Sequence, residues 1–118
     1  MLVVYTYQKC STCRDATRWL RDRGIPFTER AIRETPPGME ELTAMHEARG
    51  SLGKICNTSG MDYRALGLAT KLPGMTTGAV LDLLSSNGNL VKRPFALDPQ
   101  RGIFLTGFKL AEWESAFA

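Results

Sequence analysis

The sequence has only three cysteines and no apolar run long enough to cross a membrane. Small secreted domains held together by disulfides normally carry more cysteines in a shorter chain, which argues against that class. A membrane helix needs about 20 consecutive apolar residues. The apolar run at 2–5 is too short even for the core of a signal peptide. We therefore expect a cytoplasmic protein without a membrane segment.

A strong charge of either sign is also missing. The chain has 15 lysines and arginines against 12 acidic residues, so its net charge is only +3. Basic residues near the N-terminus are interleaved with acidic ones, a pattern typical of a solvated helix face. We expect no direct contact with nucleic acid. The length of 118 residues and the hydrophobic content of 43% suit a single domain over 1–118, and we expect a monomer.

Apolar spacing in the first 32 residues predicts a β-α-β unit. Segments at 2–5 and 27–32 predict strands on either side of a helix over 11–23. Either Ser11 or Thr12 is expected to cap the N-terminus of that helix. One face of the helix is apolar, at Cys13, Ala16, Trp19 and Leu20.

The middle of the chain, at about 38–86, predicts helices. Met39, Leu42 and Met45 have helical spacing, and Thr76 is expected to cap a later helix. The expected buried face of that later helix comprises Val80, Leu83 and Leu84. A hairpin and a closing helix follow, and their apolar residues lie at 95–97, 103–105 and 110–117.

The resulting order, β-α-β, helices, then β-β-α, predicts an α/β fold of the thioredoxin-like (glutaredoxin-like) class. Such a fold has a mixed four-stranded sheet. The helical segment at about 38–86 is then an insertion between the two halves of the sheet.

Cys10 and Cys13 stand where the first strand passes into the first helix. Unpaired backbone N–H groups and the positive end of the helix dipole favour a thiolate at that point. A second cysteine one helical turn later can resolve a sulfenate or a mixed disulfide on the first. Lys9 and Arg14 add positive charge on both sides. The spacing and its context predict redox chemistry.

Two other interpretations of the cysteines stay open. The pair could be two buried thiols that only fill space, or a zinc ion could be bound by Cys10, Cys13, His46 and Cys56. A closed zinc site usually has a second close pair of ligands, which this sequence lacks. We expect no metal, Cys56 as a small apolar core residue, and His46 near the exposed side of its helix.

Four motifs follow one another along the chain. They are Tyr5-x4-Cys10-x2-Cys13-Arg14, Asn57-Thr58-Ser59-Gly60-x2-Tyr63-Arg64-x-Leu66-Gly67-Leu68, Leu90-Val91-Lys92-Arg93-Pro94 and Gly107-Phe108-x4-Trp113. In this order they resemble the arsenate reductase (ArsC) family, including its Spx-like regulator branch. The resemblance covers essentially the whole chain.

The resemblance implies roles for individual residues. Cys10 would attack arsenate, a related oxyanion or a mixed disulfide, and Cys13 matches the second cysteine of the Spx-like switch. Arg93 matches the family's oxyanion-binding arginine, and a guanidinium suits that task because it donates two parallel hydrogen bonds. Pro94 takes the place of the cis-proline that faces the redox cysteine in thioredoxin-like folds. The predicted substrate-binding residues are Arg14, Arg93, Pro94, Ser11 and Thr12.

The sequence also departs from the family pattern. Enteric-type arsenate reductases use further arginines in the middle helical region and near the last strand, where this chain has Asn57 and Gly107. They also have a histidine shortly before the cysteine, where this chain has Thr6. These departures weaken arsenate as the physiological substrate.

Two functions therefore remain open. The first is a thiol-dependent oxidoreductase with Cys10 as nucleophile, no bound cofactor, and resolution by Cys13 or by glutathione. Glutathione, glutaredoxin or thioredoxin would be its reductant. The second is a redox-switched regulator similar to Spx, in which a Cys10–Cys13 disulfide changes the affinity for RNA polymerase.

Overall fold

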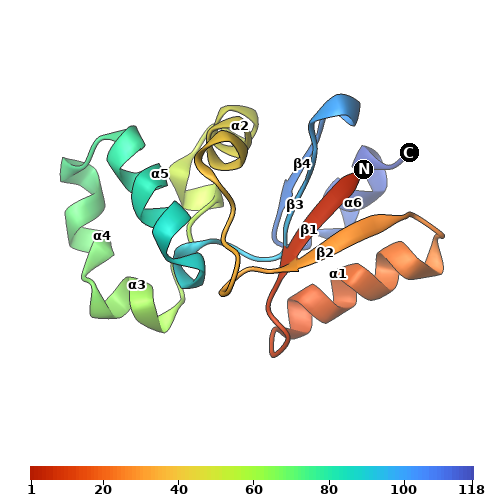
Figure 1. The fold of residues 1–118 in the computed structure, drawn as a ribbon, viewed down its shortest axis with the longest axis horizontal. Coiled ribbons are helices and arrows are strands. Elements are labelled where there is room, and N and C mark those ends of the chain that lie inside the picture. The colour runs from red at the N-terminus through yellow and green to blue at the C-terminus, as the bar shows by residue number, and fades with distance from the viewer.

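One mixed sheet of four strands organises the computed structural model, which describes residues 1–118 (Figure 1). The strands are β1 (Leu2–Thr6), β2 (Phe27–Ala31), β3 (Phe95–Asp98) and β4 (Ile103–Thr106). Their order is β2-β1-β3-β4, with β1 parallel to β2, whereas β3 is antiparallel to both β1 and β4. The predicted mixed four-stranded sheet is confirmed.

Six α-helices and four short 3₁₀ helices complete the fold. The α-helices are α1 (Ser11–Asp22), α2 (Met39–Arg49), α3 (Met61–Ala65), α4 (Leu68–Lys71), α5 (Thr77–Ser86) and α6 (Leu110–Ala116). The 3₁₀ helices are η1 (Leu52–Lys54), η2 (Leu72–Gly74), η3 (Gly88–Leu90) and η4 (Pro99–Arg101). Figure 1 shows α2–α5 gathered on the side of the molecule away from both chain termini. None of the helices has the length and apolar character to span a membrane.

The alternation of side chains along β1 gives the sheet two buried faces. Leu2 and Val4 pack on the side of α1 and α6, whereas Val3 and Tyr5 pack on the side of the inserted helices. The core on the first side comprises Leu2, Val4, Ala16, Trp19, Leu20, Ala96, Ile103, Leu105 and Trp113. Because both faces of the sheet are covered, its central strands are apolar almost throughout.

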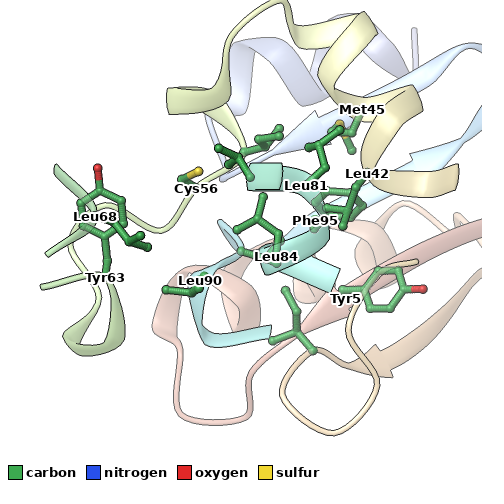
Figure 2. Packing of buried hydrophobic residues seen from close by; sticks show 14 of the residues in the cluster. Tyr5, Leu42, Met45, Cys56, Tyr63, Leu68, Leu81, Leu84, Leu90 and Phe95 are labelled. Carbon is green, nitrogen blue, oxygen red and sulfur yellow. The ribbon is translucent and has the colours of Figure 1, made fainter. Parts of the chain in front are cut away.

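The second core joins the inserted helices to the sheet. Phe95 of β3, Leu84 of α5 and Cys56 belong to one continuous cluster of 15 buried residues (Figure 2). Cys56 is 3% exposed, so the expectation of a small apolar core residue holds. The insertion therefore shares a core with the sheet and cannot move away from it without exposing apolar surface.

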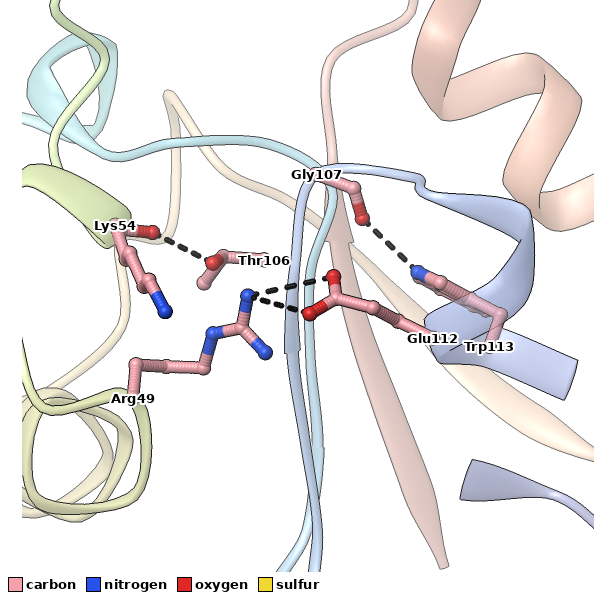
Figure 3. A network of polar contacts seen from close by, with 6 residues as sticks. All are labelled: Arg49, Lys54, Thr106, Gly107, Glu112 and Trp113. Atoms are coloured by element: carbon pink, nitrogen blue, oxygen red, sulfur yellow. Dashed lines mark hydrogen bonds and ion pairs between the residues drawn. The ribbon is translucent and has the colours of Figure 1, made fainter. Parts of the chain in front are cut away.

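Polar contacts tie the insertion to the C-terminal part of the chain (Figure 3). Arg49 at the end of α2 donates to both carboxylate oxygens of Glu112 in α6, at 3.2 and 3.4 Å. The Thr106 hydroxyl of β4 donates to the carbonyl of Lys54. These bonds cross between segments far apart in the sequence and hold α2 against α6 and η1 against the sheet.

Two details of the helical insertion differ from the sequence-based prediction. Thr76 caps α5 as expected, with its hydroxyl accepting from the N–H of Ala79 at 3.1 Å. The buried face of α5, however, contains Leu81 in place of Leu83, which is only partly buried. Met39 is exposed because it is the first residue of α2 and lies beyond the edge of the core. Periodicity predicts which segment forms an amphipathic helix, and the packing partners decide which of its apolar residues are buried.

The closing helix offers a direct test of the first core. Trp113 is fully buried, and its indole N–H donates to the carbonyl of Gly107 at 3.0 Å. We expect Trp113→Ala to lower the free energy of unfolding by about 3–5 kcal/mol, measured by urea denaturation. Leu110→Ala in the same helix is the control, because Leu110 is 50% exposed and its loss should cost under about 1 kcal/mol. Equal losses for the two variants would contradict the packing described.

Candidate active site

Cys10 is the residue that caps α1. Its backbone is extended, with φ −93° and ψ 112°, and its sulfur accepts from the N–H of Cys13 at 3.4 Å. The prediction that Ser11 or Thr12 caps the helix was wrong, because both already have helical backbone and occupy the exposed first turn. A sulfur at this position meets free N–H groups and the positive end of the helix dipole, which stabilise negative charge on it.

Cys13 lies in the first turn of α1, three residues after Cys10, and is much less exposed to solvent than Cys10. Cys13 is 2% exposed, whereas Cys10 is half-buried, and neither forms a disulfide in the structure. Burial raises the pKa of the Cys13 thiol to about 12, and its hydrogen bond to Cys10 acts in the same direction. The backbone of Tyr7 and the charge of Arg93 oppose this rise without cancelling it. Cys13 therefore keeps its proton while Cys10 reacts.

The contrast between the cysteines predicts their order of alkylation. Iodoacetamide reacts with thiolates, and burial raises the pKa of both Cys13 and Cys56. We expect Cys10 to be modified at least about 100-fold faster than either of them between about pH 6 and 9. Peptide mapping of a time course measures the three rates in one sample. A faster reaction at Cys13 or Cys56 would reverse the assignment of the nucleophile.

Arg93 approaches the cysteine pair from the loop before β3. Its guanidinium lies 5.0 Å from the centre of the Tyr7 ring, and the Tyr7 carbonyl accepts from the N–H of Cys10 at 3.0 Å. The Nη1 atom of Arg93 is buried and has no hydrogen-bond partner. The Arg93–Pro94 peptide bond is cis, as the resemblance implies. A buried donor without an acceptor is unfavourable, and an anionic ligand would supply the acceptor.

Two pockets share Tyr7 as a lining residue, and Cys13 lines the first of them. The first, which we name the Arg14 pocket, has a volume of about 380 Å³ and is lined by Thr6, Tyr7, Gln8, Cys13, Arg14, Thr17, Arg18, Arg21 and Glu29. The second, named the Arg93 pocket, has about 200 Å³ and is lined by Tyr7, Arg33, Asn57, Gly60, Met61, Asp62, Asn89 and Arg93. The predicted substrate-binding arginines, Arg14 and Arg93, thus line neighbouring pockets rather than one.

The four residues considered as zinc ligands are not assembled into a site. Cys56 belongs to the core beneath the insertion, and His46 is a half-buried residue of α2. Nowhere do three or more His, Cys, Asp or Glu side chains gather in a group that could hold a metal ion.

The geometry fits the family that the sequence resembles. A model of the ArsC family matches residues 5–116. This chain belongs to the ArsC family. It is 44% identical over 118 residues to the uncharacterized protein YusI of Bacillus subtilis, covering 99% of this chain and 98% of that protein. It is 32% identical over 102 residues to the global transcriptional regulator Spx of Enterococcus faecalis, covering 86% of this chain and 76% of Spx.

Solved structures agree on the fold. The crystal structure of a possible arsenate reductase from Streptococcus mutans superposes on this ArsC-family chain with a TM-score of 0.88 at 37% identity. The match covers 98% of this chain and 97% of that one. The thioredoxin-like arrangement predicted from the order of elements is confirmed.

The structure also shows the surroundings of Asn57 and Gly107, two positions where the sequence departs from the ArsC pattern. Asn57 lines the Arg93 pocket and donates to the carbonyl of Asn89 at 3.2 Å. Gly107 has φ +72°, and a Cβ on it would lie 3.1 Å from the Lys92 side chain. Of the three arginine positions, only position 93 keeps an arginine.

Three residues near the site, Tyr7, Arg33 and Asp62, were not predicted from the sequence. Arg33 follows β2 and reaches the Arg93 pocket, where its guanidinium donates to the Tyr7 hydroxyl at 2.9 Å. Asp62, in the first turn of α3, lines the same pocket. The only sequence signal was the position of Tyr7, three residues before Cys10 in the loop that leads to the helix.

Proposed function

We propose that this protein is a thiol-dependent oxidoreductase in which Cys10 is the nucleophile. The observation that supports it is the pairing of an accessible sulfur at the N-terminus of α1 with a buried thiol one turn below it. Cys10 can hold negative charge and meet a substrate, whereas Cys13 is shielded from solvent and kept protonated. The protein's proposed reductants are maintained in a reducing compartment, so we expect the protein to act in the cytoplasm.

With a mixed disulfide as substrate, the reaction balances without a cofactor. The Cys10 thiolate attacks one sulfur of the disulfide, a new S–S bond forms, and the other sulfur leaves as a thiolate. Cys13 or a second small thiol then loses its proton and attacks the Cys10 sulfur, which releases the remaining substrate thiol. The protein ends as a Cys10–Cys13 disulfide or as Cys10 bound to the small thiol. Glutathione, glutaredoxin or thioredoxin reduces it again.

With arsenate as substrate, Cys10 forms an S–As bond and a water molecule leaves. A second thiolate attacks the Cys10 sulfur, the S–As bond breaks, and its electron pair stays on arsenic. Arsenic(V) thus becomes arsenic(III), while two thiols become one disulfide. Arg93 and the N–H groups of Ser11 and Thr12 would hold the anion during these steps.

A redox-switched regulator is the second candidate, favoured by the similarity to Spx. In this function the Cys10–Cys13 disulfide is the signal and not a step in turnover. The proximity of the two cysteines supports such a switch, since the sulfur of Cys10 accepts from the N–H of Cys13 at 3.4 Å. Its partner would be RNA polymerase, without direct contact to DNA.

One pair of assays separates the two functions. Steady-state reduction of arsenate and of a glutathione mixed disulfide is measured with glutathione or thioredoxin recycling. In parallel, the oxidised and reduced proteins are tested for retention of purified RNA polymerase. We expect turnover of at least one substrate and equal, weak retention of the polymerase in both states. Redox-dependent retention without turnover would support the regulator instead.

A further inference from the structure

The Arg93 pocket contains two guanidinium groups fixed against one aromatic ring. Arg33 lies 4.9 Å and Arg93 lies 5.0 Å from the centre of the Tyr7 ring, and Arg33 also donates to the Tyr7 hydroxyl. Cation–π contacts of this kind restrict the orientation of both guanidiniums. Two positive charges around one side chain repel each other, so an anion between them would be stabilised. Arg33 thus supplies a second cation beside Arg93 in this pocket.

A carboxylate, that of Asp62, lines the same pocket as these cations. The side-chain amides of Asn87 and Asn89 both donate to one oxygen of Asp62, at 3.1 and 3.2 Å. These hydrogen bonds hold the pKa of Asp62 below its ordinary value, and the charges of Arg33 and Arg93 act in the same direction. No salt bridge joins Asp62 to either arginine. The pocket therefore presents two fixed positive charges and one fixed negative charge.

This combination suits a zwitterion better than a simple dianion. Sulfate or arsenate would gain from the arginines but would be repelled by Asp62. An α-amino-acid group carries a carboxylate and an ammonium on the same carbon atom. Its carboxylate can pair with the arginines while its ammonium pairs with Asp62. Its carboxylate would also give the buried Nη1 atom of Arg93 the acceptor that the structure lacks.

We propose that the Arg93 pocket binds the zwitterionic α-amino-acid head of a small thiol, with its carboxylate on Arg33 and Arg93 and its ammonium on Asp62. The inference rests on the proposed function, because the other end of this thiol would act at Cys10. Arg93 connects the two places, since its charge acts on both Cys13 and Asp62. Tyr7 connects them as well, because it lines both this pocket and the pocket that Cys13 lines.

Binding of S-methylglutathione tests the proposal without any redox step, because the methylated sulfur cannot form a disulfide. Its affinity is measured by calorimetry for three proteins: the wild type, Arg33→Met and Asp62→Asn. The affinities of S-methylcysteine and sodium sulfate for the same proteins are measured at the same fixed ionic strength. Arg64→Met is the matched control, because Arg64 lies two residues from Asp62 but does not line the pocket. Thermal denaturation of each variant confirms that it folds.

The two variants should respond differently to the two kinds of ligand. Arg33→Met should weaken both S-methylglutathione and sulfate, roughly 3- to 10-fold for a solvent-accessible charged contact. Asp62→Asn should weaken S-methylglutathione by a similar factor but strengthen sulfate, because it removes a repulsive charge. Arg64→Met should change neither. Equal binding of S-methylcysteine would identify a free amino acid as the source of the head group.

Three results would overturn the proposal. They are tighter binding of S-methylglutathione to Asp62→Asn, an unchanged affinity in Arg33→Met, and no binding to the wild type at millimolar concentration. None of these results depends on the reactivity of Cys10. If the binding proposal fails, the proposed oxidoreductase function still stands. A failure of the oxidoreductase function would be detected separately, as absence of turnover in the activity assays.

Discussion

Cys10→Ser is expected to lower thiol-disulfide exchange and arsenate reduction at least about 1000-fold. A serine hydroxyl does not ionise near neutral pH, and the helix N-terminus then has no thiolate to stabilise. The substitution is nearly isosteric, and Cys10 is only half-buried, so the fold should be retained. The measurement is kcat/KM with a glutathione mixed disulfide and with arsenate.

Two further variants make this prediction specific. Cys13→Ser should keep the first attack, and it should turn over only when glutathione resolves the intermediate. Cys56→Ser should change activity by less than about 2-fold, because Cys56 lies in the core away from the pair. Retained activity in Cys10→Ser, or a loss in Cys56→Ser with an intact fold, would refute the assignment of the nucleophile.

Arg93→Ala is expected to weaken the binding of sulfate and arsenate about 10- to 150-fold, which corresponds to roughly 1.5–3 kcal/mol for a charged hydrogen bond. A tetrahedral oxyanion near Cys10 is repelled by the thiolate, and Arg93 offsets that repulsion with a full charge and directed donors. The buried, unpartnered Nη1 atom shows that the protein itself does not use this donor. Affinities are measured at fixed ionic strength.

Arg93→Lys tests the geometry of the contact. Lysine keeps the charge but cannot make two parallel hydrogen bonds, so it should recover only part of the lost affinity. Arg64→Met again serves as control and should bind like the wild type. Equal affinity of the wild type and Arg93→Ala would mean that Arg93 does not bind the anion, and arsenate would lose its main support as a substrate.

The fold could be predicted because its signals are local. Strand 2–5 is a continuous apolar run, and α1 has one apolar stripe from Cys13 to Leu20, so each element is defined by its own residues. Thr76 likewise marks the start of α5 by its own side chain. The capping residue of α1 was missed because cysteine is an unusual N-cap, and sequence rules rank serine and threonine above it.

The candidate site was predicted only in part, because its pockets are assembled from distant segments. Cys10 and Cys13 share a motif, and the resemblance to the ArsC family identified Arg93. Arg33 and Asp62, in contrast, come to line one pocket only when the insertion packs against the sheet. No periodicity or motif connects the end of β2 with the start of α3, so their opposed charges become visible only in three dimensions.

Mapping the disulfide formed by mild oxidation tests the central claim most directly. The wild-type protein is treated with about one equivalent of hydrogen peroxide, its free thiols are blocked, and its peptides are identified by mass spectrometry. We expect a single Cys10–Cys13 disulfide, reversed by dithiothreitol, with Cys56 recovered as the blocked thiol. A disulfide that includes Cys56, or oxidation that leaves Cys10 as a free thiol, would contradict the account.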